Sequence, residues 1–184
     1  MTGSPGISAR IMEPRLEMDL PALLLSARTS RIARWWLNAV LRRAIPFNRP
    51  HGFVVTPLEG GGVRVDVPFR TLNRNHIKGL HACCLATAAE YCCGLALMGR
   101  LDAGKYRIIL KSLRMEYLYQ GRSAACAVFA PSVAEFEAQV MKGLRAEGSV
   151  LYAAKVPVTD KAGNLLATAE VVWQLKEWSR VRTR

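Results

Sequence analysis

Acidic residues are scarce in this chain. Asp and Glu total 14 against 26 Lys and Arg, which leaves a formal net charge of +12 at pH 7. Such an excess favours anionic partners, among them nucleic acid, anionic lipid and phosphorylated cofactors, without choosing between them. The sequence also lacks zinc-finger spacing, an aromatic motif of the RNA-recognition type and a basic stripe interleaved with aromatics. We therefore expect only weak, salt-sensitive contact with nucleic acid and no specific nucleic-acid partner.

The sequence has no Cys-x-x-Cys pair and no secretory or lipidation signal near its start. Its five cysteines form two adjacent pairs, Cys83-Cys84 and Cys92-Cys93, with Cys126 apart. On a helical projection Cys83 and Cys92 point in opposite directions, so we expect no metal site. The odd count indicates reduced thiols and a cytoplasmic location. We interpret the cysteines as small hydrophobic core residues.

Only one long apolar run occurs, over residues 79–98. It predicts a helix about 30 Å long that is apolar nearly all the way round and is therefore buried on all sides. A membrane span is the alternative, since about 20 apolar residues cross a bilayer. Against it, His81 and Glu90 fall inside the run, and Ala and Cys outnumber Leu and Ile. With 184 residues, 51% of them hydrophobic, we expect one globular domain.

Glu90 is the ionisable residue at the middle of this helix. Steps of 100° place it on a face of mostly small residues: Gly79, Ala82, Cys83, Ala86, Cys93, Gly94 and Leu97. A carboxylate on such a face needs a partner, a raised pKa or a chemical role. The simpler interpretation is a core helix whose Glu90 satisfies a neighbouring backbone group or an Arg.

Six segments have strand patterns: residues 53–58, 63–69, 105–119, 122–130, 149–159 and 165–178. Gly60-Gly61-Gly62 joins the first two as a hairpin, because glycine supplies the positive φ angles of the turn. Apolar positions slip in phase between Leu110 and Leu113, which predicts a β-bulge near Lys111-Ser112. The buried face of the last strand is expected to comprise Leu165, Ala167, Ala169, Val171, Trp173 and Leu175.

Shorter helices are expected outside this core. Residues 133–145 follow a capping box formed by Ser132 and Glu135, with a buried stripe of Val133, Phe136, Val140 and Leu144. A short helix is predicted at residues 20–27, after a mixed lead over residues 1–19, and another at residues 30–45. One side of the latter carries Arg31, Arg34, Asn38 and Arg42. We favour a helix packed on the domain with a solvated Arg face; weak contact with an anionic membrane and a lid over a pocket are the alternatives.

Asn75, Gly79, His81 and Glu90 together resemble the signature of hotdog-fold acyl-CoA thioesterases. In that family an Asn and a Gly precede a His followed by Gly-Gly, and an Asp or Glu lies on the central helix. Arg74-Asn75-His76 resembles a poorly characterised branch with Arg-Asn-His before the helix. Here Ala82 and Cys83 replace Gly-Gly, and Lys78 stands where a small residue is common.

The resemblance implies an α+β hotdog fold, an antiparallel sheet of about six strands wrapped around a long central helix with extra N-terminal helices. We divide the chain into a helical extension (1–50), a hotdog domain (51–178) and a basic tail (179–184). Relatives form dimers, often paired into tetramers, so a homodimer or dimer of dimers is expected. Such assembly would cover the edge strands and the small-residue helix surface.

The resemblance also implies a site for an acyl-CoA or related thioester, with coenzyme A as part of the substrate and no cofactor. Glu90 would be base or nucleophile, the Ala82 amide would polarise the carbonyl, and Asn75 would orient water or carbonyl. His81 is expected to hold the loop geometry rather than to transfer protons. Coenzyme A would be bound by Gly79 and a basic rim chosen from Arg74, Lys78, Lys105, Lys111, Arg114 and Arg122.

Two alternatives share the fold. One is a non-enzymatic binder of acyl-CoA or lipid, suggested by the missing glycines and by Leu110, which aligns where better-studied relatives carry a Ser or Thr. The other is a hydratase or dehydratase using His76 and Glu90, whose separation resembles that in fatty-acid dehydratases. The Gly-His-Phe-Pro-Gly context of those enzymes is missing here.

Overall fold

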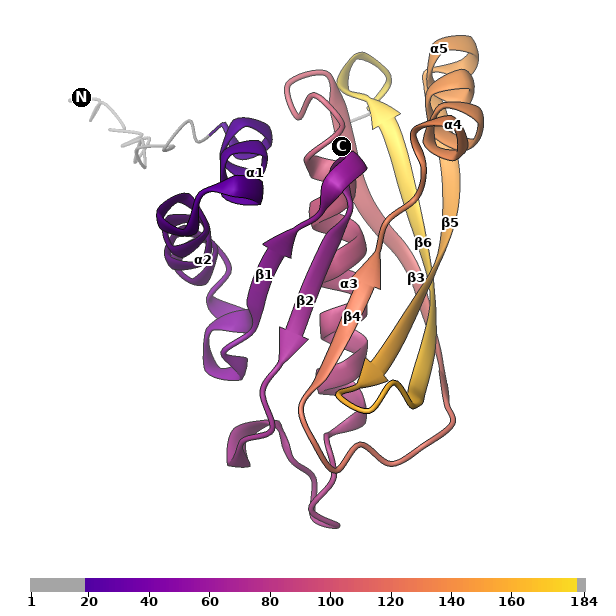
Figure 1. The fold of residues 1–184 in the computed structure, drawn as a ribbon. Helices are drawn as coiled ribbons and strands as arrows, with labels where there is room; N and C mark the ends of the chain where they lie inside the picture. The colour runs from indigo at the N-terminus through magenta and orange to yellow at the C-terminus, as the bar shows by residue number, and fades with distance from the viewer. Residues whose placement is uncertain (1–18, 182–184) are drawn as a thin grey trace, which may run out of the picture.

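A curved antiparallel sheet encloses one long helix in the computed structural model, which describes residues 19–181 (Figure 1). The strands are β1 Val54–Pro57, β2 Val63–Val67, β3 Tyr106–Tyr117, β4 Ala125–Phe129, β5 Ser149–Asp160 and β6 Leu165–Glu177. Their order in the sheet is β1-β2-β4-β5-β6-β3, so β1 and β3 are its edges. The long helix is α3, Ala82–Met98. The predicted α+β hotdog architecture is confirmed.

Successive side chains along each strand point to opposite faces of the sheet, and this alternation determines which of them face α3. In β2, Val63, Val65 and Val67 are buried and Arg64 is exposed. The glycine hairpin before it is confirmed, with Gly60 at φ 65° and Gly61 at φ 80°. The predicted bulge in β3 is confirmed as a shift in its pairing with β6 between Leu110 and Ser112.

The central helix begins three residues later than predicted, at Ala82 rather than Gly79. Residues 74–80 form a loop closed by a bridge between Arg74 and Leu80, and Lys78 has a φ of 62°. This left-handed conformation cannot continue a right-handed helix. His81 therefore becomes the N-cap, which leaves the first amide of α3 at Ala82.

Burial of α3 is one-sided rather than complete. Its C-terminal half is buried on all sides, whereas Ala82 and Cys83 are exposed and Ala86, Thr87 and Glu90 are half-buried. The prediction that all five cysteines lie in the core is therefore wrong for Cys83, because its face of the helix is not covered by the sheet. Among residues 19–181, no helix is long and apolar enough to span a membrane, and no cluster of metal-ligating side chains occurs.

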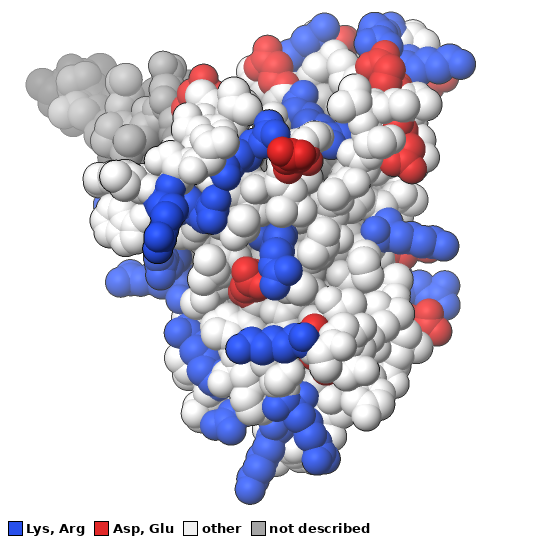
Figure 2. All heavy atoms as spheres, viewed as in Figure 1, with Lys and Arg blue, Asp and Glu red and all other residues white. Residues whose placement is uncertain are grey.

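The N-terminal helices α1 (Leu20–Thr29) and α2 (Arg31–Ala44) lie beside edge strand β1. Lys and Arg side chains gather over this side of the molecule (Figure 2). Asn38, expected on the solvated side, is buried because its amide binds the backbone of Val55. Arg34 turns back to donate to the carbonyls of Ala27 and Arg28. The 3-10 helix η1, Pro46–His51, then leads to β1.

The second predicted helix is present as α4 Val133–Phe136, a π-helical turn Glu137–Met141 and α5 Lys142–Glu147. Its capping box is confirmed: Ser132 Oγ accepts from the Glu135 amide and Glu135 Oε2 accepts from the Ser132 amide. Val133, placed in the buried stripe, is exposed, since the first turn projects beyond the sheet. Leu165 is also more exposed than predicted, because it begins β6 at the end of the sheet. Of the predicted lead, only Asp19 belongs to the described residues, and it caps α1. The end of the predicted tail, after Val181, also lies outside the described residues.

Candidate active site

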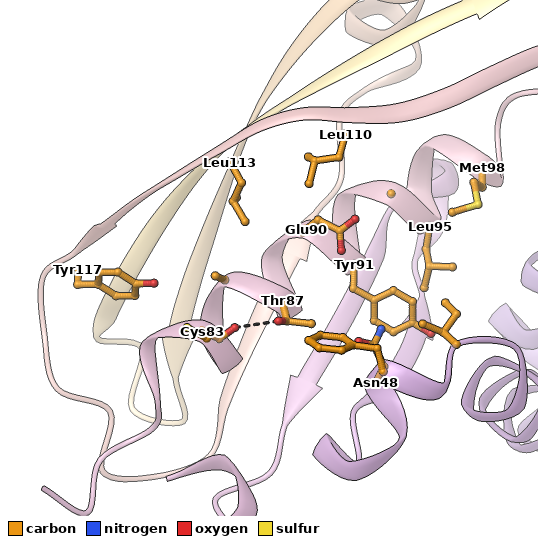
Figure 3. A pocket seen from close by; sticks show the side chains of 14 residues that line it. Asn48, Cys83, Thr87, Glu90, Tyr91, Leu95, Met98, Leu110, Leu113 and Tyr117 are labelled. Atoms are coloured by element: carbon orange, nitrogen blue, oxygen red, sulfur yellow. Dashed lines mark hydrogen bonds between the residues drawn. The ribbon is translucent and has the colours of Figure 1, made fainter. Parts of the chain in front are cut away.

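A cavity of about 410 Å³ lies against the half-buried face of α3. The helix forms its floor, β3 forms one wall and residues of η1 form the other (Figure 3). Most of the lining is apolar. Its members are Ile45, Phe47, Asn48, Cys83, Ala86, Thr87, Glu90, Tyr91, Gly94, Leu95, Met98, Leu110, Leu113 and Tyr117.

Glu90 places its carboxylate in this cavity, pointing from α3 toward β3 beneath Leu110 (Figure 3). Within residues 19–181 it forms no ion pair and no hydrogen bond. Burial among apolar groups therefore raises the pKa of Glu90 with no opposing cation to lower it. The simpler interpretation of Glu90, a carboxylate satisfied by backbone or Arg, finds no such partner among the described residues.

Gly94 and the β3 bulge shape the surroundings of the carboxylate. Gly94, one turn further along α3, packs against Trp173: a Cβ there would lie 3.1 Å from the Trp173 ring and 3.9 Å from Glu90 Oε1. Opposite, Leu110 and Leu113 both face α3, although an odd separation in a regular strand would place them on opposite faces. The bulge between Leu110 and Ser112 inserts one extra residue, so that Leu110 and Leu113 lie on the same face of the strand. The cavity wall above Glu90 is therefore apolar.

The first turn of α3 presents one amide for binding. The His81 ring accepts a hydrogen bond from the Cys83 amide at 3.1 Å, and the His81 carbonyl accepts from Cys84 and Leu85 at 3.0 and 3.2 Å. The Ala82 amide donates to no other group in the described part of the chain. His81 is thus an N-cap, and Ala82 offers a free N–H at the positive end of the helix dipole.

Asn75 shapes the loop that precedes α3. Its Oδ1 accepts from the amides of Ile77 at 3.2 Å and Gly79 at 3.0 Å. Gly79 is buried, and a Cβ there would come within 2.8 Å of the Gln120 side chain. Asn75 and Ala82 line a second cavity of about 310 Å³. The structure thus brings Asn75 and Ala82 together at one cavity, whereas Glu90 lines the other.

Tyr117 separates the two cavities and was not among the predicted site residues. It lines both of them, and its hydroxyl donates to the Ala82 carbonyl at 3.0 Å. Thr87 and Phe47 were missed as well. Thr87 could have been found by its spacing of three residues from Glu90 on one helix face. Tyr117 and Phe47 carry no such signal, because they reach the site from other elements.

The predicted basic rim is dispersed over the surface. Arg74 lies over the Phe69 ring and donates to Thr71 Oγ1. Lys78 projects from the loop before α3, and Lys111 is the bulged residue of β3. Arg114 follows Leu113 in β3 and so faces away from α3. None of these lines the Glu90 cavity. His76, the partner required for hydratase chemistry, is exposed and also absent from that lining.

Residues 33–175 match the family described as a domain of unknown function, DUF4442. The chain belongs to the DUF4442 family. A search of curated protein sequences finds no match for this DUF4442 chain.

Solved structures with the same fold carry thioesterase descriptions. PA5026 from Pseudomonas aeruginosa, a protein of unknown function called a "probable thioesterase", is 22% identical with a TM-score of 0.70, covering 78% of this chain and 95% of its own. A mutant of the thioesterase PA1618 from the same organism is 13% identical with a TM-score of 0.60 (83% and 99% covered). The thioesterase HI1161 from Haemophilus influenzae is 12% identical with a TM-score of 0.59 (80% and 92% covered). The DUF4442 chain thus has the same hotdog fold as these structures.

Proposed function

We propose that this protein hydrolyses the thioester bond of an acyl-CoA. The observation that carries the proposal is the unpaired Glu90 carboxylate on the floor of an apolar cavity, in a fold shared with proteins described as thioesterases. An apolar cavity suits an acyl chain, and a carboxylate with a raised pKa is a better proton acceptor than an ordinary one. The five free cysteines fit a reducing compartment, and we place the reaction in the cytoplasm.

In this reaction Glu90 accepts a proton from water as the water oxygen attacks the thioester carbonyl carbon. The Ala82 amide donates to the oxygen on which negative charge develops, and the helix dipole adds to this stabilisation. The carbon–sulfur bond then breaks, the thiolate takes up the proton, and a carboxylic acid and the thiol of coenzyme A result. Direct attack by the Glu90 carboxylate, followed by hydrolysis of the anhydride, gives the same products.

Two copies of the chain are needed to assemble this site. Ala82 and Glu90 are eight residues apart on one helix, which separates them by about 12 Å along the axis at 1.5 Å per residue. One thioester carbonyl cannot contact both in a single protomer. A two-fold axis beside α3 would bring the partner's helix start to Glu90. Edge strand β3 and the two residues after it carry exposed apolar side chains and are suited to such pairing: Ile109, Leu110, Tyr117, Leu118 and Tyr119.

Coenzyme A would lie along the start of α3 rather than in the Glu90 cavity. Arg74 and Lys78 belong to the loop whose Asn75 lines the second cavity, although neither of them lines it. Gly79 keeps that loop close to Gln120. Lys111 and Arg114 come from the edge strand and would contribute across the subunit boundary. Phosphate groups are attracted to such cations and to the free helix amide.

A hydrolysis panel of short, long and aromatic acyl-CoAs tests the proposal, with release of free thiol as the readout. Glu90→Gln keeps the shape of the side chain and should lower kcat by at least a hundredfold. Glu147→Gln removes an exposed carboxylate on α5 and is the matched control. If no substrate is hydrolysed, or if Glu90→Gln is as active as the control, hydrolysis through Glu90 is excluded.

Leu110 and Leu113 favour a second candidate function, acyl-CoA binding without turnover. Both are apolar and stand over Glu90, so neither supplies a hydroxyl there to orient water. A binder would show saturable acyl-CoA binding by calorimetry that Glu90→Gln leaves within about threefold, together with no thiol release. The same panel therefore separates the two functions.

A further inference from the structure

The outer face of α2 exposes large apolar side chains. Ile32 is 74% exposed, Trp35 61% and Trp36 54%. The two Trp rings meet edge to face with their centroids 5.1 Å apart. We call Ile32, Trp35 and Trp36 the α2 outer surface. The fold does not need them, because the inner face of α2 already packs on the domain through Leu37, Asn38 and Leu41.

The segment that forms this surface carries charges of one sign. Residues 20–58 contain no Asp or Glu and six arginines: Arg28, Arg31, Arg34, Arg42, Arg43 and Arg49. Arg34 is engaged with α1 carbonyls. Arg31, Arg42 and Arg43 are exposed on the same helix as the two Trp residues. A solvent-facing helix side in an ordinary globular protein would be polar, with charges of both signs.

We propose that the α2 outer surface docks on an anionic lipid bilayer. Trp side chains are favoured at the boundary between headgroups and acyl chains, because an apolar ring and a polar N–H suit both layers. Ile32 would enter the acyl region beside them. The arginines would contact lipid phosphates, which attract cations near an anionic surface. Apolar insertion with surrounding cations fits a bilayer better than a nucleic acid, which offers phosphates without an apolar layer.

Docking would orient the Glu90 cavity relative to the membrane. Helix α2 ends at Ala44, and the next residues, Ile45 and Phe47, line that cavity. Phe47 is exposed while lining it. The docked helix would therefore lie directly beside one cavity wall. The docking itself is independent of thioester hydrolysis, and its measurement requires no turnover.

Cosedimentation of the full chain with vesicles tests the proposal. The vesicles contain phosphatidylcholine alone or phosphatidylcholine with roughly 30% phosphatidylglycerol, at about 0.1 M salt, where charges are screened beyond roughly 10 Å. We expect at least tenfold tighter binding to the anionic vesicles, weakened at about 0.5 M salt. Brominated lipid should quench Trp emission. Equal binding to both vesicle types, or no binding to either, overturns the proposal.

Two variant pairs identify the surface. Trp35→Ser with Trp36→Ser should weaken binding at least tenfold, whereas Val133→Ser with Leu151→Ser, also exposed apolar positions, should change it less than twofold. Arg31→Gln with Arg43→Gln should weaken binding at least fivefold. Lys142→Gln with Lys161→Gln removes the same charge from other exposed sites and should have a smaller effect. Thermal unfolding checks that each variant is folded.

Three further results would contradict lipid docking. The Trp variant could bind vesicles as well as wild type, which would assign binding to another surface. Sedimentation analysis could show that the Trp variant dissociates an oligomer, which would make the α2 outer surface an interface between copies. Salt-sensitive retention of RNA, lost in the Arg variant while vesicles are not bound, would assign the surface to nucleic acid.

Discussion

The side chain of Asn38 forms hydrogen bonds with both backbone groups of Val55. Asn38 Nδ2 donates to the Val55 carbonyl at 2.9 Å, and the Val55 amide donates to Asn38 Oδ1 at 2.7 Å. Val55 belongs to edge strand β1, whose outer side has no neighbouring strand in the described chain. One amide side chain of α2 thus replaces the two bonds that a further strand would form. Edges left open are sites of aggregation, so this contact also protects the sheet.

Asn38→Ala should destabilise the fold by about 2–3 kcal/mol, because it leaves two buried backbone groups without partners. For a chain of this size the melting temperature should fall by roughly 4–12 °C. Gln139→Ala, at an exposed position, is the control. Circular dichroism melting measures both, and a loss below about 0.5 kcal/mol for Asn38→Ala would show that the contact is dispensable.

Glu90→Gln should stabilise the protein at neutral pH. Burial raises the pKa of Glu90 in the folded state above its ordinary value of 4.5. The folded state is therefore favoured below that ordinary value, and this contribution is lost as pH rises through the higher folded pKa. Melting at pH 4, 6 and 8 should show a gain for Glu90→Gln that grows with pH. A gain in stability that is greatest at pH 4 would show that the folded state does not raise the pKa of Glu90.

The same raised pKa should appear in the kinetics. If Glu90 is the base, the acid limb of kcat/KM for acyl-CoA hydrolysis should have its midpoint above 4.5, since the carboxylate form is required. The pH profile of the purified enzyme measures it. A profile flat down to pH 4 would mean that Glu90 does not accept the proton.

His81→Asn should retain both stability and activity, whereas His81→Ala should lose about 1 kcal/mol. The reason is that the His81 ring accepts from the Cys83 amide, and Asn is also a good N-cap. Melting curves and thiol release for the two variants decide between a capping role and proton transfer. An inactive but fully stable His81→Asn would favour proton transfer.

Lys78→Gly should be more stable than Lys78→Ala by about 1 kcal/mol. Lys78 has a φ of 62°, and a side chain in this left-handed conformation costs roughly 1–2 kcal/mol, part of which is offset by the greater freedom of glycine in the unfolded chain. Both variants remove the same charge, so the difference between their stabilities reports the cost of the backbone conformation. Chemical denaturation with urea measures it, and equal midpoints would show that the loop carries no strain.

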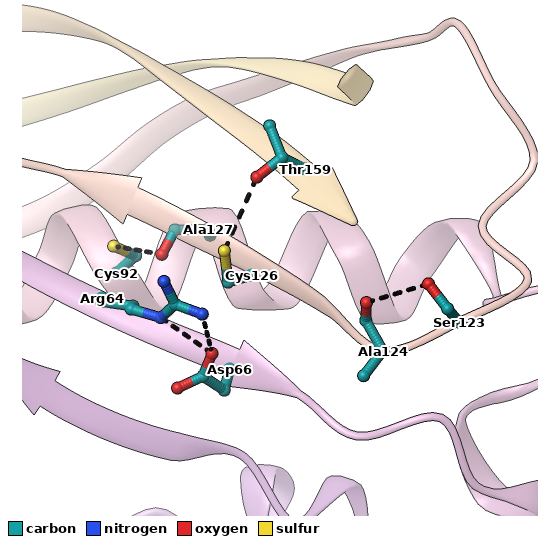
Figure 4. A network of polar contacts seen from close by, with 8 residues as sticks. All are labelled: Arg64, Asp66, Cys92, Ser123, Ala124, Cys126, Ala127 and Thr159. Carbon is teal, nitrogen blue, oxygen red and sulfur yellow. Dashed lines mark hydrogen bonds and ion pairs between the residues drawn. The ribbon is translucent and has the colours of Figure 1, made fainter. Parts of the chain in front are cut away.

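Cys83 should be the fast-reacting thiol of the native protein. It is exposed, whereas burial raises the pKa of Cys84 and of Cys93 to about 12. Cys92 and Cys126 are enclosed by neighbouring strands, where their sulfur atoms contact Ala127 and Thr159 (Figure 4). Labelling with a chromogenic disulfide at pH 8 should modify about one thiol rapidly, and Cys83→Ser should remove that phase. Rapid modification of several thiols would mean that the core opens readily.

The sequence by itself determined the elements, because their signals are local. Alternating valines indicated β2, the phase slip between Leu110 and Leu113 located the bulge, and Ser132 with Glu135 marked a helix start. The hotdog fold was implied by the resemblance of Asn75, Gly79, His81 and Glu90 to a family signature. Local signals failed at Gly79, where the left-handed Lys78 delays the helix, and at Val133, because apolar periodicity does not show where a sheet ends.

Only the tertiary structure decided how the side chains meet. Asn38 lies on the polar side of its helix in sequence, and its burial follows from the backbone of a strand seventeen residues away. Tyr117 and Phe47 reach the Glu90 region from separate elements, and their proximity depends on the curvature of the sheet. Glu90 has no partner among residues 19–181, and this depends on which side chains fold against it rather than on its neighbours in the chain. Local patterns encode helices and strands, whereas a site depends on contacts between segments that the sequence places far apart.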